Sequence, residues 1–199
     1  MTARPASRVA RRGSRAGLAT APRRARRRGE HAPDAAGPRP VQCAIVTVSD
    51  TRRGADDLGG ALLARMLTGA GHAVASRGWV RDEVAAIRKA ARAALAKPAI
   101  DTVLVTGGTG MSPRDVTPEA LAPLFEKRLD GFGELFRMRS WSQVGAAAWF
   151  SRAGAGIAKG RLLVMLPGSM RALELAMNEL LLPELVHVMR TLGRFPNPE

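Results

Sequence analysis

A glycine-rich stretch carries the residue types best suited to binding a charged ligand: residues 106–110 are Thr-Gly-Gly-Thr-Gly, and Asp115 follows five positions later. Glycine adopts positive φ without strain and lets a ligand approach the backbone, so such a turn can direct several N–H groups at one anion. The stretch is neither a Walker A motif nor the dinucleotide fingerprint. We expect an anion-binding loop with contacts from Thr106, Gly107, Gly108, Thr109 and Gly110. The alternative is a glycine-rich loop with only a structural role.

Further polar residues follow other strand-like runs of the sequence. In an open α/β sheet, ligands bind at the carboxyl ends of the strands, so residues at these ends should gather on one rim. Glycine loops and helix N-termini favour phosphate, whereas clustered carboxylates repel it unless a divalent cation lies between them. The combination predicts Mg²⁺ and a phosphorylated ligand. The residues concerned, besides the glycine loop, are Ser49, Asp50, Asp82, Asp115, Pro167, Gly168 and Ser169.

Some of these residues have a simpler explanation as helix caps. Asp82 precedes a predicted helix and can be its N-cap, and Ser169 can cap the helix that starts at Met170. Asp115 lies two residues before Thr117, which is the better cap candidate, so a capping role suits Asp115 less well. None of the three histidines has neighbours that indicate a metal ligand or a catalytic base.

The elements that must position these residues alternate between strand-like and helix-like patterns. Apolar runs predict strands, and apolar residues at intervals of three or four predict helices. Such alternation indicates an α/β fold with a mainly parallel sheet and helices on both faces. We expect a helix break at residues 130–133 and make no assignment for 141–158. Strands are predicted at 41–48, 72–80, 102–106 and 161–166, and helices at 58–69, 84–97, 118–125, 134–139, from 170 onward, and from 183 to about 193.

The first 40 residues differ from the rest in composition. They hold 11 Arg, no Lys and two acidic residues, and so carry +9 of the +14 net charge. Such a segment buries too little apolar area to offset its ordering entropy, so we expect a disordered tail. A basic arm that binds nucleic acid is one interpretation; a misassigned start site or a solvated tail is the other. Because the tail has no aromatic residue for stacking, we expect no specific nucleic-acid partner. Residues 41–199 suit one domain.

Nothing in the sequence predicts a membrane or an oxidising compartment. No stretch approaches the roughly 20 apolar residues of a membrane span, and the tail has no apolar region typical of a secretion signal. The single cysteine, Cys43, lies in a strand-like run and is expected to be a small buried residue. We therefore expect a cytoplasmic protein.

Several motifs occur in the order found in one known family. The chain resembles the MoaB/MogA family of molybdenum cofactor biosynthesis, and the likeness covers nearly all of residues 41–199. The region from Gly131 to Arg139 is closer to the MoaB branch. The motifs that carry the resemblance are Thr47-Val48-Ser49-Asp50, the glycine loop, Pro113-Arg114-Asp115-Val116-Thr117-Pro118-Glu119, Gly131-Phe132-Gly133-Glu134, Ser151-Arg152 and Leu166-Pro167-Gly168-Ser169.

The resemblance implies a three-layer α/β/α molybdopterin-binding fold that assembles as a trimer or hexamer. It implies Mg²⁺-dependent transfer of AMP from ATP to molybdopterin, with release of pyrophosphate. The family's essential, metal-binding aspartates match Asp82 and Asp115 here. Its substrate and nucleotide contacts match the glycine loop, the Pro167–Ser169 turn, Ser49, Asp50, Glu134, Ser151 and Arg152.

Two other functions remain open from the sequence. Some members of the MoaB branch resemble the adenylyltransferase without evident activity, so a molybdopterin-binding or assembly protein is one alternative. Nucleic-acid binding through the arginine-rich tail is the second. Because the chain keeps both Asp82 and Asp115, we favour the enzyme.

Aromatic residues are concentrated in one segment of the chain. Five of the eight Phe and Trp residues lie within positions 132–150. A segment this apolar predicts a surface patch that a second subunit or a bound pterin covers. The five residues are Phe132, Phe136, Trp141, Trp149 and Phe150.

Overall fold

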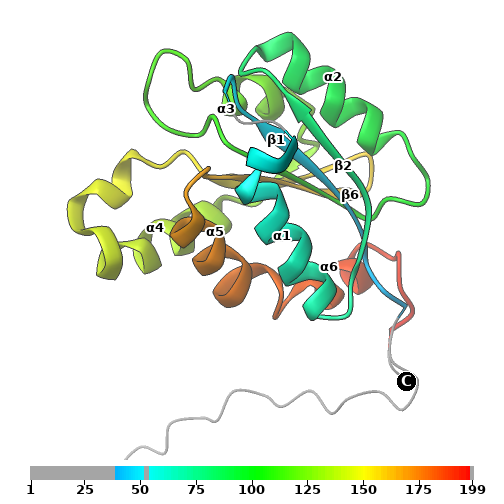
Figure 1. Cartoon of the computed structure of the whole chain (residues 1–199). Helices are drawn as coiled ribbons and strands as arrows, with labels where there is room; N and C mark the ends of the chain where they lie inside the picture. Colours follow the sequence, from blue (N-terminus) through cyan, green and yellow to red (C-terminus); the bar gives the residue numbers. More distant parts are fainter. Residues whose placement is uncertain (1–38, 52–53, 198–199) are drawn as a thin grey trace, which may run out of the picture. The chain divides into compact units, whose positions relative to one another are not determined.

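The structure is a computed structural model that describes residues 39–51 and 54–197 (Figure 1). The predicted arginine-rich tail therefore lies outside the described residues, except for Arg39 and Pro40. Among the described residues, no helix is long and apolar enough to cross a membrane.

Within the described residues, six strands form one sheet in the order β2-β1-β3-β6-β5-β4. The first four strands in this order run parallel, while β5 is antiparallel to both β6 and β4. The prediction of a mainly parallel sheet is thus confirmed. The bounds are β1 (Gln42–Val48), β2 (Ala73–Val80), β3 (Thr102–Thr106), β4 (Lys127–Arg128), β5 (Gly154–Ala158) and β6 (Arg161–Leu166).

Helices cover both faces of this sheet, which gives the three-layer α/β/α arrangement (Figure 1). Helices α1, α4, α5 and α6 pack on one face, and α2 and α3 pack on the other. The helices are α1 (Leu58–Gly69), α2 (Val84–Leu95), α3 (Thr117–Leu121), α4 (Asp130–Val144), α5 (Met170–Leu175) and α6 (Leu185–Thr191). Shorter turns are η1 (Gly54–Asp56), η2 (Ala122–Leu124), η3 (Gly145–Phe150) and the π-helical η4 (Ala176–Leu181).

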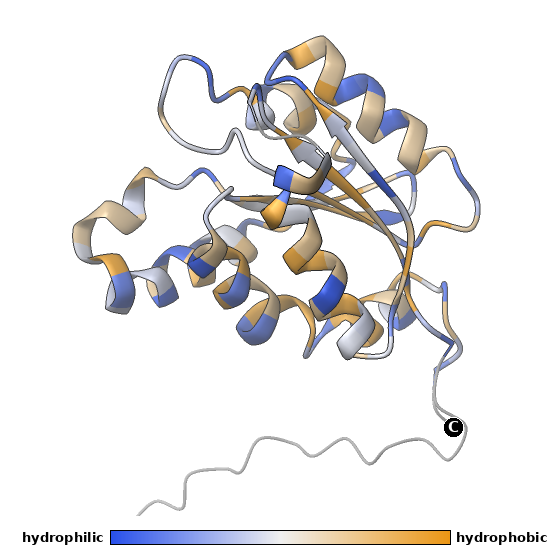
Figure 2. Cartoon of the chain, in the orientation of Figure 1, coloured by the Kyte–Doolittle hydropathy of each residue, from blue (hydrophilic) through white to orange (hydrophobic). Residues whose placement is uncertain are grey.

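Strand residues point alternately into the two cores. Cys43 and Ile45 of β1 pack against α1 and its neighbours, whereas Ala44 and Val46 pack against α2 and α3. This follows from the two-residue period of a strand, and a strand buried on both faces needs the continuous apolar run seen in the sequence. Figure 2 shows the central strands as hydrophobic and the helices as mixed. Burial raises the pKa of the Cys43 thiol to about 12, and the negative charge of Asp101 adds to this.

Helix α4 is longer than predicted, and the expected break at residues 130–133 is wrong. The chain breaks earlier, at the short strand β4, and α4 runs without interruption from Asp130. Gly133 is buried, and a Cβ there would lie 2.8 Å from the Ala153 carbonyl oxygen. Glycine at this position therefore reflects close packing of α4 against the chain that enters β5. Strand β5, in a segment without a clear pattern, was not predicted.

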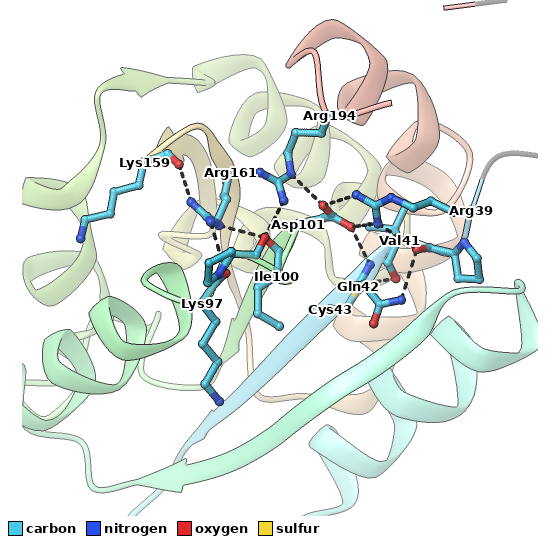
Figure 3. A network of polar contacts seen from close by, with 12 residues as sticks. Arg39, Val41, Gln42, Cys43, Lys97, Ile100, Asp101, Lys159, Arg161 and Arg194 are labelled. Carbon is cyan, nitrogen blue, oxygen red and sulfur yellow. Dashed lines mark hydrogen bonds and ion pairs between the residues drawn. The ribbon is translucent and has the colours of Figure 1, made fainter. Parts of the chain in front are cut away.

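A buried carboxylate at the amino end of β3 joins the two ends of the domain (Figure 3). Asp101, directly before β3, is fully buried. Its oxygens accept hydrogen bonds from the Arg39 guanidinium (2.7 and 3.0 Å), from Arg194 Nε (2.7 Å) and from the Gln42 N–H (2.9 Å). Burial alone would raise the pKa of Asp101, but these hydrogen bonds and the arginine charge hold it below its usual value.

Candidate functional site

The glycine loop joins β3 to α3 at the carboxyl rim of the sheet. Gly107 and Gly108 have φ of 102° and 64°, and a Cβ on Gly107 would lie 2.2 Å from the Val48 carbonyl oxygen. The loop is held by its neighbours: the Gly107 N–H donates to Leu166 (3.0 Å), and the Thr117 hydroxyl donates to the Gly107 carbonyl (2.7 Å). The backbone path thus requires glycine at positions 107 and 108, and hydrogen bonds within the protein hold the loop in place.

Asp82 and Asp115 lie beside this loop. A Cβ on Gly108 would come within 2.8 Å of both Asp82 carboxylate oxygens, and one on Gly110 within 2.7 Å of Asp115 Oδ2. Asp82 is not a helix cap, since the N-cap of α2 is Glu83 and Asp82 instead accepts a hydrogen bond from the Val116 N–H (3.2 Å). The sequence alternative for Asp82 is therefore wrong.

The cap predicted at Thr117 is wrong, because Val116 is the N-cap of α3, whereas the N-cap position predicted for Ser169 is confirmed. Thr117 is the first residue of α3, and its hydroxyl binds the glycine loop. Ser169 occupies the N-cap position of α5, but its side chain makes no capping hydrogen bond. Asp115 is not a cap either: its Oδ2 accepts from the Ser112 N–H (3.0 Å).

The negative charges of Asp82 and Asp115 are stabilised mainly by hydrogen bonds from backbone N–H groups. Burial raises the pKa of Asp82; the charges of Asp115 and Glu119 raise it further, while the Val116 N–H and Arg152 oppose the shift. Among the described residues neither Asp82 nor Asp115 has an ion pair. A pair of nearby carboxylates in this condition would bind a cation favourably.

Most predicted site residues line one cavity of about 570 Å³, hereafter the glycine-loop cavity. It lies between the loop, the turn after β6, and the end of η3. The predicted residues that the structure brings together here are Asp82, Gly107, Gly108, Thr109, Gly110, Asp115, Ser151, Pro167, Gly168 and Ser169. Val48 and Phe150 complete the lining and were not predicted.

The other predicted residues lie around this cavity. Ser49 and Thr106 line a smaller neighbouring cavity of about 270 Å³, and the Thr106 hydroxyl donates to the Pro167 carbonyl (2.9 Å). Asp50 pairs with Arg114, and its Oδ1 accepts from the Asp82 N–H (3.2 Å). Asp50 thus positions the backbone of a candidate metal ligand.

Arg152 holds the loop through protein contacts. Its guanidinium donates to the Gly110 carbonyl (2.8 Å), to the Asp115 carbonyl and to the Glu119 carboxylate. Its own N–H donates to the Thr109 carbonyl (2.9 Å). With these partners Arg152 positions the loop and Asp115. The sequence did not reveal this role, because all of the partners lie far along the chain and all but the Glu119 carboxylate are backbone atoms.

Glu134 lies in a different cavity, of about 460 Å³, which also contains Arg128, Asp130 and Arg137. We call this the charged cavity. It meets the glycine-loop cavity at Ser151, which lines both.

The predicted aromatic patch is only partly exposed. Phe136 is 2% exposed and stacks on Phe132 with ring centroids 6.5 Å apart, so its placement in a surface patch is wrong. Trp141, Trp149 and Phe150 are 62%, 68% and 41% exposed. Because α4 is one continuous helix, Phe136 packs into the core. The expected break at residues 130–133 had made this segment look too short to bury such a side chain.

Comparisons with known proteins agree with this fold. Residues 44–187 match the family model described as "Probable molybdopterin binding domain". The chain is 45% identical over 155 residues to molybdenum cofactor biosynthesis protein B of Bacillus subtilis (strain 168), covering 77% of this chain and 91% of that protein. The protein of the same name from Escherichia coli (strain K12) is 40% identical over 146 residues, with 73% and 86% covered.

Solved structures show the same likeness. A crystal structure of molybdenum cofactor biosynthesis protein B has a TM-score of 0.76 and 44% identity, covering 82% of this chain and 99% of that one. The tungsten cofactor synthesizing protein MoaB from Pyrococcus furiosus has a TM-score of 0.67 and 32% identity, with 79% and 99% covered.

Proposed function

Because the chain belongs to the MoaB/MogA family of molybdenum cofactor biosynthesis, we propose that it transfers AMP from ATP to molybdopterin in a reaction that requires Mg²⁺. The products are adenylylated molybdopterin and pyrophosphate. One observation supports this chemistry above the others: Asp82 and Asp115, which have no ion-pair partner among the described residues, flank the glycine loop.

The donor set of this site suits Mg²⁺. Among the described residues no cluster of three or more His, Cys, Asp or Glu could form a closed metal cage. Mg²⁺ is usually held by one or two carboxylates together with substrate phosphates and water, so a closed cage is not needed. Each aspartate uses one oxygen for a recorded backbone hydrogen bond, Val116 N–H or Ser112 N–H, which leaves the other oxygen for the metal.

The residues of the chain then have separate roles. The N–H groups of Gly108, Thr109 and Gly110 would bind phosphate oxygens, and Asp82 and Asp115 would hold Mg²⁺, which would neutralise charge on the phosphates. The attacking group is a phosphate monoester, which is largely ionised near neutral pH because its second pKa is about 6. No protein base is therefore required, and none of the described residues that line the cavity is a histidine.

The decisive experiment is incubation of the full chain with molybdopterin, ATP and Mg²⁺, followed by assay for adenylylated product and pyrophosphate. Asp115→Asn keeps the shape and the Ser112 hydrogen bond but removes one charge. We expect this variant to fold normally and to lose activity by about 100-fold or more, since the metal contributes several kcal/mol of charge stabilisation. A folded Asp115→Asn protein with full activity would contradict the proposal. Molybdopterin binding without product would instead identify a binding or assembly protein.

We also propose that the protein assembles as a trimer or hexamer through the exposed side chains that follow the buried part of α4. Met138, Trp141 and Val144 are 60%, 62% and 53% exposed on one helix. Single exposed apolar residues are common on protein surfaces, whereas three large ones close together on a helix are typical of a contact surface. Trp141→Asp should lower the oligomer mass measured by light scattering while the fold is retained. An unmodified chain that is monomeric at micromolar concentration would refute this assembly.

A further inference from the structure

Arg114 is held beside the glycine-loop cavity by a side chain that also supports Asp82. Its guanidinium pairs with one oxygen of the Asp50 carboxylate, and the other oxygen accepts a hydrogen bond from the Asp82 N–H (3.2 Å). Arg114 also directly precedes Asp115, which lines the cavity together with Asp82. The guanidinium is therefore linked to both candidate metal-binding aspartates, to Asp82 through Asp50 and to Asp115 through the backbone.

A tight turn fixes the backbone from which Arg114 extends. The Asp115 N–H donates to the Ser112 carbonyl (2.9 Å), and the Ser112 N–H donates to Asp115 Oδ2 (3.0 Å). The Arg114 N–H donates to the Ser112 hydroxyl (3.4 Å). The guanidinium itself is recorded with one partner, Asp50, and the side chain is 72% exposed. Because exposed side chains change rotamer rapidly, Arg114 can exchange this partner for a ligand while the main chain stays in place.

The glycine-loop cavity lacks positive charge for the ligands of the proposed reaction. Two carboxylates line it, Asp82 and Asp115, and no lysine or arginine among the described residues does so. A triphosphate and a phosphate monoester bring several more negative charges, and Mg²⁺ neutralises only part of them. The guanidinium of Arg152 is engaged with protein groups, namely two backbone carbonyls and the Glu119 carboxylate. A further cation that can turn to the ligand is therefore needed beside the cavity.

The ion pair between Arg114 and Asp50 is of a kind that a phosphate can displace. The two side chains are 72% and 29% exposed, and ion pairs in contact with water contribute little to stability. A phosphate group offers two oxygens to the guanidinium in a bidentate geometry, and such charge-assisted hydrogen bonds are among the stronger ones in proteins. After the exchange, Asp50 still accepts the hydrogen bond from the Asp82 N–H, so the backbone of that aspartate keeps its support.

We propose that Arg114 exchanges Asp50 for the β- and γ-phosphates of ATP and stabilises the pyrophosphate that leaves. This inference rests on the proposed adenylyl transfer. In that reaction an oxygen of the molybdopterin phosphate forms a bond to the α-phosphorus of ATP. The bond between the α-phosphorus and the oxygen that bridges to the β-phosphorus breaks, and its electron pair leaves with pyrophosphate. The N–H groups of Arg114 donate to oxygens of this leaving group, where negative charge accumulates.

The first test compares ligands with and without the β- and γ-phosphates. Calorimetry measures the affinity of the full chain, with Mg²⁺, for pyrophosphate and for AMP. Arg114→Gln should weaken pyrophosphate binding by about tenfold or more, because a charged hydrogen-bond donor is lost, and should leave AMP binding nearly unchanged. The rate of adenylyl transfer should fall by about 100-fold or more, in line with arginines at other phosphoryl-transfer sites.

The matched control is Arg81→Gln. Arg81 is exposed, precedes Asp82 in the sequence, and has no recorded ion pair among the described residues. The control removes the same charge from the same side of the domain, and we expect little change in pyrophosphate affinity. An equal loss in both variants would show that only the general charge of this surface matters. That result, or an unchanged pyrophosphate affinity in Arg114→Gln, would overturn the assignment.

The second test separates ligand binding from a structural role of the ion pair. Asp50→Asn keeps an acceptor for the Asp82 N–H but removes the charge that holds Arg114. Because a competitor of the phosphate is lost, this variant should bind pyrophosphate at least as tightly as wild type, whereas Arg114→Gln binds it more weakly. An ion pair that only fixes the loop would give the same loss in both variants, since each of them breaks the pair. Such an equal loss would overturn the inference.

The outcomes also separate this inference from the proposed function. A selective loss of pyrophosphate affinity in Arg114→Gln, together with a wild type that forms no adenylylated product, would support the phosphate contact and reject adenylyl transfer. Product formation at equal rates in wild type and Arg114→Gln would support adenylyl transfer and overturn the role of Arg114.

Discussion

The two ends of strand β3 hold carboxylates in opposite electrostatic situations. At the amino end, Asp101 is fully buried and accepts hydrogen bonds from two arginines and one backbone N–H (Figure 3). At the carboxyl end, Asp82 and Asp115 flank the glycine loop and accept hydrogen bonds from backbone N–H groups, without an ion pair among the described residues. The pKa of Asp101 is lowered, and the pKa of Asp82 is raised.

This difference is the one expected between a carboxylate that stabilises the fold and carboxylates that bind a charged ligand. A buried carboxylate whose two oxygens accept all the hydrogen bonds they can stabilises one arrangement of the chain. Removing it leaves the arginine and N–H donors without their acceptor. A carboxylate that is desolvated and lacks a cation makes the ligand-free protein less stable than it could be. Such incomplete compensation is typical of sites that bind a charged ligand.

The largest effect on stability is expected for Asp101→Ala. Arg194, which is 20% exposed, would lose its carboxylate partner, and we expect the free energy of unfolding to fall by about 3 kcal/mol. Urea denaturation measures this loss. Activity per folded molecule should be unchanged, since Asp101 lies at the opposite end of β3 from the glycine loop. The control is Asp130→Ala, which removes an ion pair with Arg128 in which both side chains are exposed. We expect this variant to lower the free energy of unfolding by about 0.5 kcal/mol or less.

The pH dependence of this contribution follows from the lowered pKa of Asp101. The stabilisation is fully present above the ordinary aspartate pKa and is lost as pH falls through the lower pKa of the folded state. The stability difference between wild type and Asp101→Asn should therefore shrink in acid. A difference that does not change with pH would show that packing, not charge, accounts for the effect.

Arg152→Lys should have the next largest effect. Lysine cannot reach the Gly110 and Asp115 carbonyls and Glu119 at once, so the loop and Asp115 become less well positioned. We expect a loss of about 1–2 kcal/mol in stability and a higher Mg²⁺ concentration for half-maximal nucleotide binding. Arg139→Lys, at an exposed pair with Glu179, is the matched control. An unchanged Mg²⁺ requirement in Arg152→Lys would remove Arg152 from the positioning role.

In the ligand-free protein, Asp82→Asn should not lower the free energy of unfolding, in contrast to Asp101→Ala. It removes a desolvated charge and keeps an acceptor for the Val116 N–H, so stability near neutral pH should be unchanged or slightly higher. A raised folded-state pKa means that wild type recovers stability relative to the variant as pH falls through that value. Mg²⁺ binding by wild type should weaken over the same range. A clear loss of stability in Asp82→Asn at neutral pH would show that the protein already stabilises the negative charge of Asp82, contrary to this prediction.

The smallest effect concerns the start of the domain. A chain that begins at Arg39 keeps the hydrogen bonds to Asp101 and the contact of the guanidinium with the Phe195 ring (4.4 Å), whereas a chain that begins at Val41 loses both. Because Arg39 is 49% exposed, we expect the shorter chain to be less stable by about 1 kcal/mol or less. Both should assemble and turn over as the full chain does. Loss of turnover in the chain beginning at Arg39 would give the preceding residues a function.

The alternation of strands and helices was predictable from the sequence because local rules govern it. Short, β-branched apolar runs such as 102–106 favour strands buried on both faces, and the polar ends of parallel strands meet on one rim. This was sufficient to predict the parallel sheet and to place Asp82, Asp115 and the glycine loop together. The glycines themselves could be recognised because positive φ is a local requirement.

Contacts between distant segments were decided only by the tertiary structure. The course of α4 depends on the close approach of Gly133 to Ala153, and strand β5 is held by pairing with β4 and β6 although its own sequence has no clear period. The roles of Arg152 and Asp101 rest on partners 33 to 93 residues away, among them backbone carbonyls that carry no residue-specific signal. The residue types were therefore visible in the sequence, but packing alone determined that Asp101 pairs with two arginines while Asp82 and Asp115 have no ion pair among the described residues.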